Sequence, residues 1–308
     1  MFKKIKRYLN NPYFALGNDM IKKCPRLMSD KFYLSVLWMS VMGYELDWKH
    51  PQTFNEKLQW LKLCNRSPLY TTLVDKYRVK QWVSEKIGEQ YVIPTLAKYE
   101  SVDEIELDKL PNQFVLKCNH DSGSVVICRD KESFDSTAAK RKLDACLKHD
   151  FYLDTREWPY KNVQRCIMAE QFLAPSPGSD DLPDYKFFCF NGNADCVMVC
   201  IDRLSSQTRF YFFDEKWNLM RLNGWGKKAP DGFTLPQPKN LDKMFELAAV
   251  LSQGISFVRV DFYNVDGDIR FGEMTLFPDG GLDYRILPEA DEYFGQKIEL
   301  PLKEHKLL

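Results

Sequence analysis

The stretch at residues 255–281, ISFVRVDFYNVDGDIRFGEMTLFPDGG, decides the fold. Its segments FVRVDFY and DIRFGEMTL have the period-2 pattern, rich in aromatic and β-branched residues, that predicts strands. The residues between them, 264–268, are mostly Asn, Asp and Gly, which favour a tight turn. The stretch therefore predicts an antiparallel hairpin, which we centre on Gly267.

Two acidic side chains face each other in this hairpin. Centring the turn in this way places Asp261 opposite Glu273 and Arg259 opposite Thr275, with all four side chains on one face. Facing carboxylates repel each other unless a positive group lies between them, and Mg²⁺ prefers one or two carboxylates together with phosphate oxygens and water. Two interpretations follow: the acids hold Mg²⁺, or they form ion pairs with Arg259 and Arg270 on a solvated hairpin.

The composition is typical of a globular protein with one or two closely packed domains. A chain of 308 residues can bury a sizeable core, and its 44% hydrophobic and 28% charged residues fit that class. The formal net charge is zero, so nothing indicates a nucleic-acid partner. Nine cysteines without a CxxC spacing and four scattered histidines predict neither a disulfide framework nor a zinc site, which favours the reducing cytoplasm.

The N-terminal region is expected to be helical without spanning a membrane. Residues 1–10 are basic but lack the apolar segment of a secretory signal. The longest apolar stretch, 33–44, is too short to cross a bilayer. Because residues 1–10 carry apolar side chains on one side and basic ones elsewhere, weak contact with an anionic membrane is one interpretation, and a solvated helix is the simpler one.

Helical and strand patterns along the rest of the chain are grouped rather than alternating. Thr53, followed three residues later by Glu56, predicts a capping box that opens a helix. Residues 73–87 are amphipathic and are followed by Gly88, which predicts one continuous helix. Strands that neighbour strands favour an α+β fold over a doubly wound parallel sheet.

A loop of small polar residues follows the predicted strand that ends at Lys117. In this loop, 119–124, backbone amides can approach an anion closely, and a lysine beside it is a natural phosphate ligand. The spacing does not match a Walker-type loop. A phosphate-binding loop and a plain hairpin turn both remain open on these residues alone.

Five motifs, in this order, resemble the TupA-like branch of the ATP-grasp superfamily. They are PQTFNEKL at 51–58, DKY at 75–77, EWPYK at 157–161, DYKF at 184–187 and VRVDFY at 258–263. The resemblance implies two α+β subdomains with mainly antiparallel sheets that clasp ATP, which we expect over 71–172 and 173–308. A helical region over 1–70 is expected to precede them.

The resemblance also implies which residues contact ATP. Lys76 and Lys117 resemble the lysines that hold the α- and β-phosphates. The loop is expected to cover the phosphates through His120, Ser122, Gly123 and Ser124. A hinge whose backbone reads adenine is implied at Glu170, Gln171, Phe172 and Leu173, with Asp184 near the ribose.

The remaining implied roles concern the metal and the reaction. Asp261 and Glu273 resemble the Mg²⁺ ligands, and Thr275 occupies the third ligand position, where many family members carry Asn. Arg259 resembles the arginine that stabilises the acyl phosphate, and Lys186 is implied to lie toward the γ-phosphate.

The function that the resemblance implies is an ATP- and Mg²⁺-dependent ligase that joins a carboxylate to an amine through an acyl phosphate. The branch is associated with bacterial teichuronopeptide and capsular-polysaccharide synthesis, so the substrates would include a uronic-acid-containing glycan or an amino acid. A kinase acting on a glycan hydroxyl, with His120 or Asp121 as base, is an alternative. A second alternative is a glycosyltransferase that uses a DxD motif at 266–268, although turn chemistry explains that motif. A third alternative is a non-catalytic nucleotide-binding scaffold.

Overall fold

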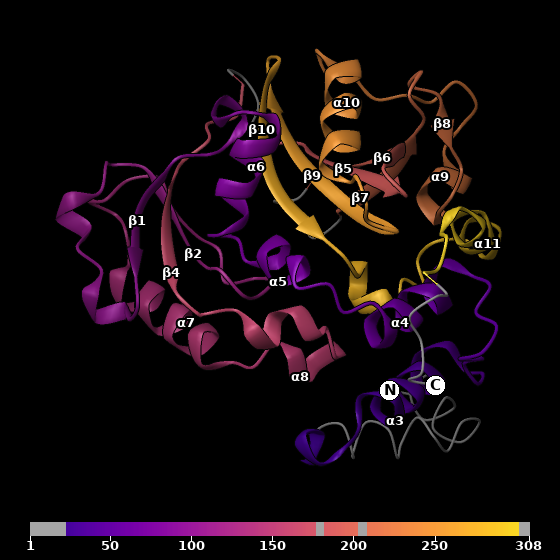
Figure 1. The fold of residues 1–308 in the computed structure, drawn as a ribbon. Coiled ribbons are helices and arrows are strands. Elements are labelled where there is room, and N and C mark those ends of the chain that lie inside the picture. Colours follow the sequence, from indigo (N-terminus) through magenta and orange to yellow (C-terminus); the bar gives the residue numbers. More distant parts are fainter. Residues whose placement is uncertain (1–22, 177–181, 203–207, 302–308) are drawn as a thin grey trace, which may run out of the picture.

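The computed structural model describes residues 23–176, 182–202 and 208–301. Two antiparallel sheets lie beside each other, and N-terminal helices lie below them in the view of Figure 1. This arrangement confirms the predicted α+β class with a helical N-terminal region. No helix within these ranges is long and apolar enough to cross a membrane, and the membrane contact predicted for residues 1–10 falls outside them.

The smaller sheet has four strands in the order β1-β4-β2-β3. They are β1 (Thr95–Tyr99), β2 (Phe114–Cys118), β3 (Val126–Cys128) and β4 (Ile167–Gln171). Helix α7 (Ser136–Lys148) begins after Asp135, whose side chain accepts a hydrogen bond from a backbone amide in the first turn. The buried Leu143 of α7 packs into the core of this sheet. Helices α8 (Tyr152–Thr155) and η5 (Trp158–Asn162) then lead the chain back to β4.

The larger sheet has six strands in the order β10-β9-β5-β6-β7-β8. They are β5 (Asp184–Phe190), β6 (Asn193–Ile201), β7 (Arg209–Phe213), β8 (Leu219–Met220), β9 (Phe257–Val265) and β10 (Asp268–Thr275). Helix α10 (Leu241–Leu251) covers one face, where Phe245 meets Phe187 with ring centroids 4.9 Å apart. The predicted boundary between 172 and 173 falls in the connection from β4 to β5, and as a domain boundary it stays a prediction.

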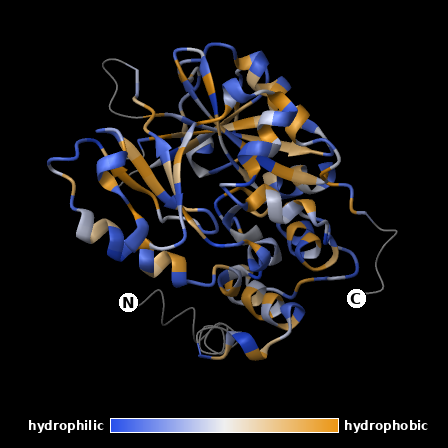
Figure 2. Ribbon diagram, turned by 60° about the vertical axis from the view of Figure 1, so that its left-hand side comes forward, coloured by the Kyte–Doolittle hydropathy of each residue, from blue (hydrophilic) through white to orange (hydrophobic). Residues whose placement is uncertain are grey.

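The opposite face of the larger sheet is covered by α4 (Phe54–Cys64) and α11 (Pro288–Lys297). Phe54 and Phe294 lie 5.5 Å apart and both contact Phe188 of β5. Helix α4 begins with the predicted capping box, because Thr53 accepts from the Glu56 amide and Glu56 accepts from the Thr53 amide. Hydrophobic residues run along the strands in Figure 2, in agreement with a core centred on the sheets.

The predicted continuous helix at 73–87 is wrong. The chain forms α5 (Leu69–Val74) and α6 (Val79–Ile87), separated at Asp75. The Asp75 carboxylate accepts hydrogen bonds from the Tyr77 and Arg78 amides at 2.9 and 3.2 Å, and these local bonds replace helical ones. The remaining helices are α3 (Asp30–Met42), α9 (Gly224–Lys228) and the short turns η1 (Pro25–Leu27), η2 (Glu89–Tyr91), η3 (Val102–Glu104), η4 (Leu107–Lys109) and η6 (Pro278–Gly281).

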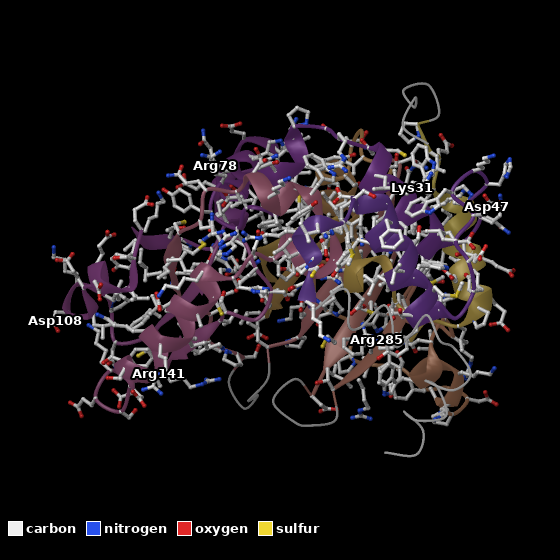
Figure 3. The ribbon with its side chains drawn as sticks, turned by 90° about the horizontal axis from the view of Figure 1, so that it is seen from below. Lys31, Asp47, Arg78, Asp108, Arg141 and Arg285 are labelled. Atoms are coloured by element: carbon white, nitrogen blue, oxygen red, sulfur yellow. The ribbon has the colours of Figure 1, made fainter. Side chains whose placement is uncertain are left out.

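Charged side chains at the surface point outward, as Arg78, Asp108 and Arg141 do in Figure 3. A smaller set of charged residues is buried, and it includes Lys62, Asp121, Glu157, Glu170, Asp184 and Asp261. Burying a charge is costly unless it is paired or does chemical work. This set therefore marks the region in which to look for a functional site.

Candidate active site

The position of the candidate site follows from the register of β5 and β9. Lys186 lies opposite Asp261, and four residues further along β5, Phe190 lies opposite Phe257. Side chains two residues apart share a face, so one face of the sheet changes from charged to aromatic along its length. Phe54 of α4 covers the aromatic end, with its ring centroid 4.8 Å from that of Phe257. The charged end borders a cavity instead.

The hairpin of β9 and β10 has the predicted facing pairs. Asp261 lies opposite Glu273, and Arg259 lies opposite Thr275. The predicted reason is wrong, however, because the turn is not centred on Gly267: near the turn Asp268 pairs with Val265.

A β-bulge restores the register that the turn alone would not give. Asp266 and Gly267 form a two-residue turn, both with positive φ, at 55° and 101°. Phe271 pairs with Phe262, and the extra residue Gly272 then shifts the pairing by one. Asp268 is the first residue of β10 and pairs with Arg270 at 2.9 Å, so the residues 266–268 lie at the hairpin turn and its edge.

Arg259 lies between the two facing carboxylates. Its Nε and Nη2 donate to the two oxygens of Asp261, each at 2.7 Å, and Nη2 also donates to Glu273 Oε1 at 3.1 Å. Thr275 Oγ1 accepts from the same nitrogen at 3.1 Å. Lys186 Nζ lies 2.6 Å from Asp261 Oδ2. The positive group that the facing acids require is therefore a guanidinium in this structure.

The charges in this network reinforce one another. Burial would lower the pKa of Arg259, but the Asp261 carboxylate outweighs it and raises that pKa. Burial would raise the pKa of Glu273, but nearby cations outweigh it and lower that pKa to about 2. Those cations are Lys76, Arg259, Lys186 and Lys117. Lys117, Lys186 and Arg259 also pair with the carboxylates of Glu170, Asp184 and Asp261. Lys76 has no carboxylate partner among the described residues, so its charge can act on an anion.

The donor set at this hairpin fits Mg²⁺. Asp261 and Glu273 supply carboxylate oxygens from adjacent strands, and the Thr275 hydroxyl lies 3.2 Å from Glu273 Oε1. Mg²⁺ binds through one or two carboxylates plus phosphate and water, which matches two acids better than a closed cage. No cluster of three or more His, Cys, Asp or Glu able to hold a metal occurs in the described part of the chain. Both Asp261 oxygens already accept from cations, so metal binding there needs Arg259 or Lys186 to give up a contact.

The smaller sheet supplies a second set of cations through Glu170. Lys117 Nζ lies 2.6 Å from Glu170 Oε2, and Lys80 Nζ lies 2.5 Å from Oε1. Burial would raise the pKa of Glu170, but the two lysines outweigh it and lower that pKa. Lys80 of α6 was not predicted, and no local sequence signal reveals it, because its partner is ninety residues away in β4.

Two of the predicted hinge residues lie within a strand. Glu170 lies within β4 and its backbone pairs with both neighbouring strands, opposite Thr95 and Val115. Gln171 is the last residue of β4, and its amide donates to the Pro94 carbonyl at 3.1 Å. The Glu170 backbone is thus engaged in the sheet, while its side chain pairs with the two lysines.

Only the last two predicted hinge residues lie beyond the strand. They are Phe172, whose ring lies 5.2 Å from the Arg129 guanidinium, and Leu173. Asp184, predicted near the ribose, lies 2.5 Å from Lys186 Nζ, so it contributes to the charged network.

Lys76 is positioned by the break between α5 and α6. Its amide donates to the Asn119 carbonyl at 2.9 Å, and its Nζ donates to the Asp121 carbonyl. Asn119 Nδ2 in turn donates to Asp75 Oδ1 at 2.9 Å. The break in the helix and the predicted phosphate loop are thus one hydrogen-bonded unit, with Lys76 at its centre.

The loop itself presents fewer side chains than predicted. Ser124 Oγ donates to Asp121 Oδ1 at 2.6 Å and accepts from the Cys118 amide, so it braces the loop. The buried His120 ring lies 3.3 Å from the His149 carbonyl, and burial lowers its pKa. Asp121 and Ser122 line the cavity, and Gly123 has a φ of 103°. The structure therefore brings the loop to the site through its backbone and Ser122 rather than through His120 or Ser124.

Some of these groups line a cavity of about 350 Å³. Its walls come from both halves of the molecule, and they are formed by Lys76, Asp121, Ser122, Phe151, Asp154, Thr155, Glu157, Tyr160, Arg259, Glu273, Thr275, Phe277, Asp279 and Gly280. Glu157 and Tyr160 belong to the EWPYK motif.

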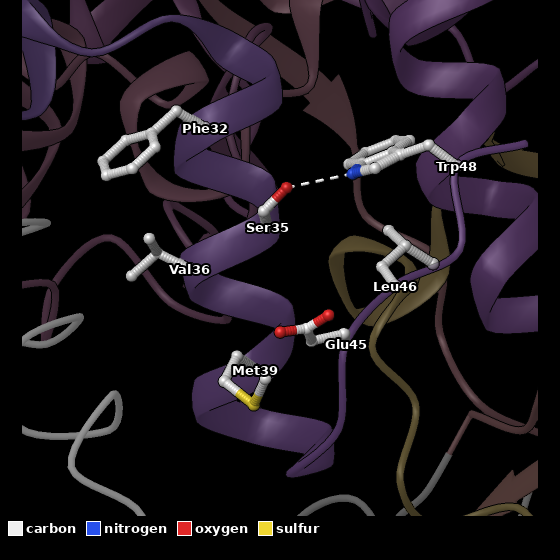
Figure 4. Close-up of a pocket in the computed structure, with 7 residues that line it drawn as sticks. All are labelled: Phe32, Ser35, Val36, Met39, Glu45, Leu46 and Trp48. Atoms are coloured by element: carbon white, nitrogen blue, oxygen red, sulfur yellow. Dashed lines mark hydrogen bonds between the residues drawn. The ribbon is translucent and has the colours of Figure 1, made fainter. Parts of the chain in front are cut away.

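A second cavity, of about 240 Å³, lies among the N-terminal helices, and Figure 4 shows it. Its lining is mainly apolar, and the Trp48 indole donates to Ser35 Oγ across it at 2.9 Å. It has no lysine or arginine in its wall, so it is not suited to an anion.

Comparison with protein families identifies the chain. The sequence model described as TupA-like ATPgrasp matches residues 56–299. The chain belongs to the TupA-like ATP-grasp family. The five motifs on which the resemblance was based lie within residues 56–299 of this TupA-like protein, except for the first five residues of PQTFNEKL.

Solved structures similar to this TupA-like protein are ATP-grasp ligases of low identity. PsnB complexed with a minimal precursor, Mg and ADP is 10% identical with a TM-score of 0.37, over 72% of this chain and 57% of that chain. D-alanine–D-alanine ligase from Bacillus anthracis complexed with ATP is 17% identical with a TM-score of 0.41, over 73% and 61%. D-cycloserine synthetase DcsG is 15% identical with a TM-score of 0.42, over 75% and 70%.

The match covers little more than half the length of PsnB. It covers 57% of PsnB in the structure with Mg and ADP, and 54% in the structure with the minimal precursor. The comparison with curated proteins returned no match.

Proposed function

We propose that this TupA-like protein is an ATP- and Mg²⁺-dependent ligase that joins a carboxylate to an amine through an acyl phosphate. One observation carries the proposal: Lys76 and Arg259 line the cavity together with Glu273, and the charges of Lys76, Arg259, Lys186 and Lys117 lower the pKa of Glu273. Phosphoryl transfer needs charge neutralisation and alignment more than covalent help from the protein, and this array supplies both.

The phosphates of ATP would lie among these cations. Lys117, held by Glu170, and Lys76, held by the loop, would contact the α- and β-phosphates. Lys186 would lie toward the γ-phosphate. The loop amides and Ser122 would cover the phosphates, and the chain at Phe172 and Leu173, beyond the end of β4, would contact adenine through its backbone.

Asp261 and Glu273 would hold Mg²⁺, with Thr275 as a third oxygen donor. When bound, Mg²⁺ supplies neutralisation of the phosphate charge that develops during transfer. Arg259 would then release part of its contact with Asp261 and stabilise the oxyanion of the carboxylate substrate. Its position between the two acids, 3.1 Å from Glu273, allows this exchange over a short movement.

The reaction would proceed in two steps at one cavity. A carboxylate oxygen of the substrate attacks the γ-phosphorus, forming an acyl phosphate and releasing ADP. The amine then attacks the acyl carbon, the amide bond forms, and phosphate leaves. We propose that the carboxylate belongs to a uronic acid or an amino acid and that the product enters a bacterial surface polysaccharide, as the family association suggests.

Release of ADP and phosphate tests this proposal. D-glucuronate, D-galacturonate and N-acetyl-L-glutamate serve as carboxylates, and L-lysine, D-glucosamine and ethanolamine as amines. The proposal predicts that turnover needs one compound from each set. Turnover that needs no carboxylate contradicts it, and a stable phosphomonoester that survives hydroxylamine would assign the protein as a kinase instead.

A further inference from the structure

We propose that Glu157 binds the ammonium group of the amine substrate and removes its proton before the attack on the acyl phosphate. This inference rests on the ligase reaction proposed above, and it assigns the second substrate to a defined wall of the cavity. Nothing in the nucleotide-binding array uses this residue.

Glu157 is a buried carboxylate that lines the cavity. It is 5% exposed, and it lies between α8 and η5 at the start of the EWPYK motif. The Thr155 hydroxyl donates to its Oε1 at 2.7 Å. Among the described residues it forms no ion pair, although burying an unpaired carboxylate is costly. A positively charged ligand group in the cavity would remove that cost.

The cavity walls differ in charge. Lys76 and Arg259 provide the positive wall, where the phosphates and the carboxylate substrate are expected. The lining also contains negatively charged and aromatic side chains. The acids are Glu157, Asp154 and Asp279, and the aromatic residues are Phe151, Tyr160 and Phe277. Aromatic faces and carboxylates together suit an ammonium group.

Of these three acids, Glu157 is the one for which no direct ion pair occurs among the described residues, although the charge of Lys62 acts on it. Asp154 is paired with His149 at 2.9 Å, and Asp279 is paired with Arg285. Glu157, Tyr160 and Glu273 line the same cavity. An amine held by Glu157 would therefore share that cavity with the acyl phosphate.

The surroundings of Glu157 favour proton transfer. Burial raises the pKa of Glu157, which makes the carboxylate a better base. The charged groups that face it are Lys62 of α4, Asp154 of α8 and Lys76. Lys62 opposes the shift through its charge but does not cancel it, and its ammonium donates to the Thr155 carbonyl at 2.8 Å and the Gly280 carbonyl at 2.5 Å.

The proposed step balances as follows. The ammonium group R–NH₃⁺ gives one proton to the Glu157 carboxylate and becomes R–NH₂. Its lone pair forms the C–N bond, the C–O bond to phosphate breaks, and the second proton leaves nitrogen with the departing phosphate as HPO₄²⁻. Glu157 then returns its proton to solvent, so no further reactant is needed.

Hydroxylamine separates the two halves of the reaction. It is uncharged near neutral pH, so it traps an acyl phosphate as the hydroxamate without a base. We expect Glu157→Gln to form hydroxamate from ATP and D-glucuronate within about twofold of the wild-type rate. Amide formation with L-lysine should fall by about 100-fold or more, the scale of a lost general base. Glu292→Gln, an exposed residue outside the cavity, is the control and should change neither rate.

The pH dependence of kcat/KM for the amine is a second measurement, which a purely structural role of Glu157 would leave unchanged. In Glu157→Gln, kcat/KM for the amine should rise tenfold per pH unit below the pKa of the amine, because only free amine reacts. Glu157→Asp, which keeps a carboxylate, should restore part of the rate near neutral pH. Equal loss of hydroxamate and amide formation in Glu157→Gln would overturn the inference and leave the proposed function standing, as would full retention of both. Absence of hydroxamate from the wild-type protein with every carboxylate probe would overturn the proposed function as well.

Discussion

Arg259 and Asp261, two residues apart on β9, form a two-point ion pair in which Nε and Nη2 each donate to a different carboxylate oxygen at 2.7 Å. Lys186 adds a third contact to the same carboxylate at 2.6 Å. Asp261 is 2% exposed, so its negative charge holds two buried cations in place. Asp261, which is suited to bind a metal, thus also stabilises the fold.

Asp261→Asn is expected to lower both stability and nucleotide binding. Removing one partner of a buried ion pair leaves the other charge uncompensated, so the free energy of unfolding should fall by about 3 kcal/mol. Stabilisation by Mg-ATP should shrink, because ligand-linked stability follows affinity for the native state. Thermal unfolding with and without Mg-ATP measures both effects.

Asp268→Asn provides the matched comparison for this experiment. Asp268 lies on the same hairpin and pairs with Arg270, but its side chain is 58% exposed. We expect little change in stability and a full Mg-ATP shift, since exposed pairs contribute about 1 kcal/mol or less. An Asp261→Asn protein with the full wild-type Mg-ATP shift would show that Asp261 has no role at the metal.

The two lysines on Glu170 allow structure and binding to be separated. Lys80 also donates to the Ile93 carbonyl at 2.7 Å and to Thr95 Oγ1 at 3.0 Å, so it ties α6 to the smaller sheet. The charge of Lys117 helps to lower the pKa of Glu273, and Lys117 is the lysine that we propose contacts the phosphates.

Lys117→Met and Lys80→Met should therefore differ in their response to Mg-ATP. Each removes one ion pair of Glu170, so each should lower the free energy of unfolding by about 2 kcal/mol. Only Lys117→Met should lose most of the Mg-ATP thermal shift. Equal shifts in the two variants would place the phosphates away from Lys117.

Glu273 gives the apo protein a defined acid sensitivity. Its pKa falls from 4.5 to about 2, so the unfolded chain takes up a proton before the folded chain does. The stability it contributes is complete above 4.5 and is lost as the pH falls toward about 2. Solvent screening reduces the size of the effect, because the side chain is 39% exposed. Urea unfolding at about pH 6 and about pH 3 should show a smaller pH difference for Glu273→Gln than for the wild-type protein.

Lys62 should produce a pH dependence of the same sign, but in alkali. Burial lowers its pKa from 10.5 to about 8, so between these values the unfolded chain binds a proton that the folded chain does not. Stability contributed by this residue therefore rises with pH across that window, by about 3 kcal/mol at most. The free energy of unfolding of the wild-type protein, measured relative to that of Lys62→Met, should therefore rise from about pH 8 to about pH 10. A constant difference would mean that Lys62 keeps its proton in the folded state.

The sequence predicted those parts of the site that depend on strand periodicity. Alternation on two strands and a turn signal were enough to bring Asp261, Glu273, Arg259 and Thr275 to one face. The compensating bulge at Gly272 could not be foreseen, because a bulge changes register without changing the local pattern. The predicted register therefore agrees because two errors cancelled: the turn was centred on the wrong residue, and the bulge at Gly272 was not foreseen.

Features that depend on long-range partners were not predictable. The break at Asp75 needs Asn119 as well as local amides, and helix propensity alone favours a continuous helix. The pairing of Lys80 with Glu170 joins a helix to a strand of another part of the chain. Likewise, the burial of Glu157 depends on how η5 packs, which its own sequence does not specify.

Transfer of an isotope label tests the central claim most directly. A carboxylate substrate labelled with ¹⁸O in both oxygens would attack the γ-phosphorus with one of them, and cleavage of the acyl phosphate by the amine would leave that oxygen on phosphate. Mass spectrometry of the released phosphate should therefore detect one ¹⁸O atom per phosphate, with an amide as the other product. Phosphate without the label, released while amide forms or while ATP is consumed, would contradict an acyl-phosphate ligase.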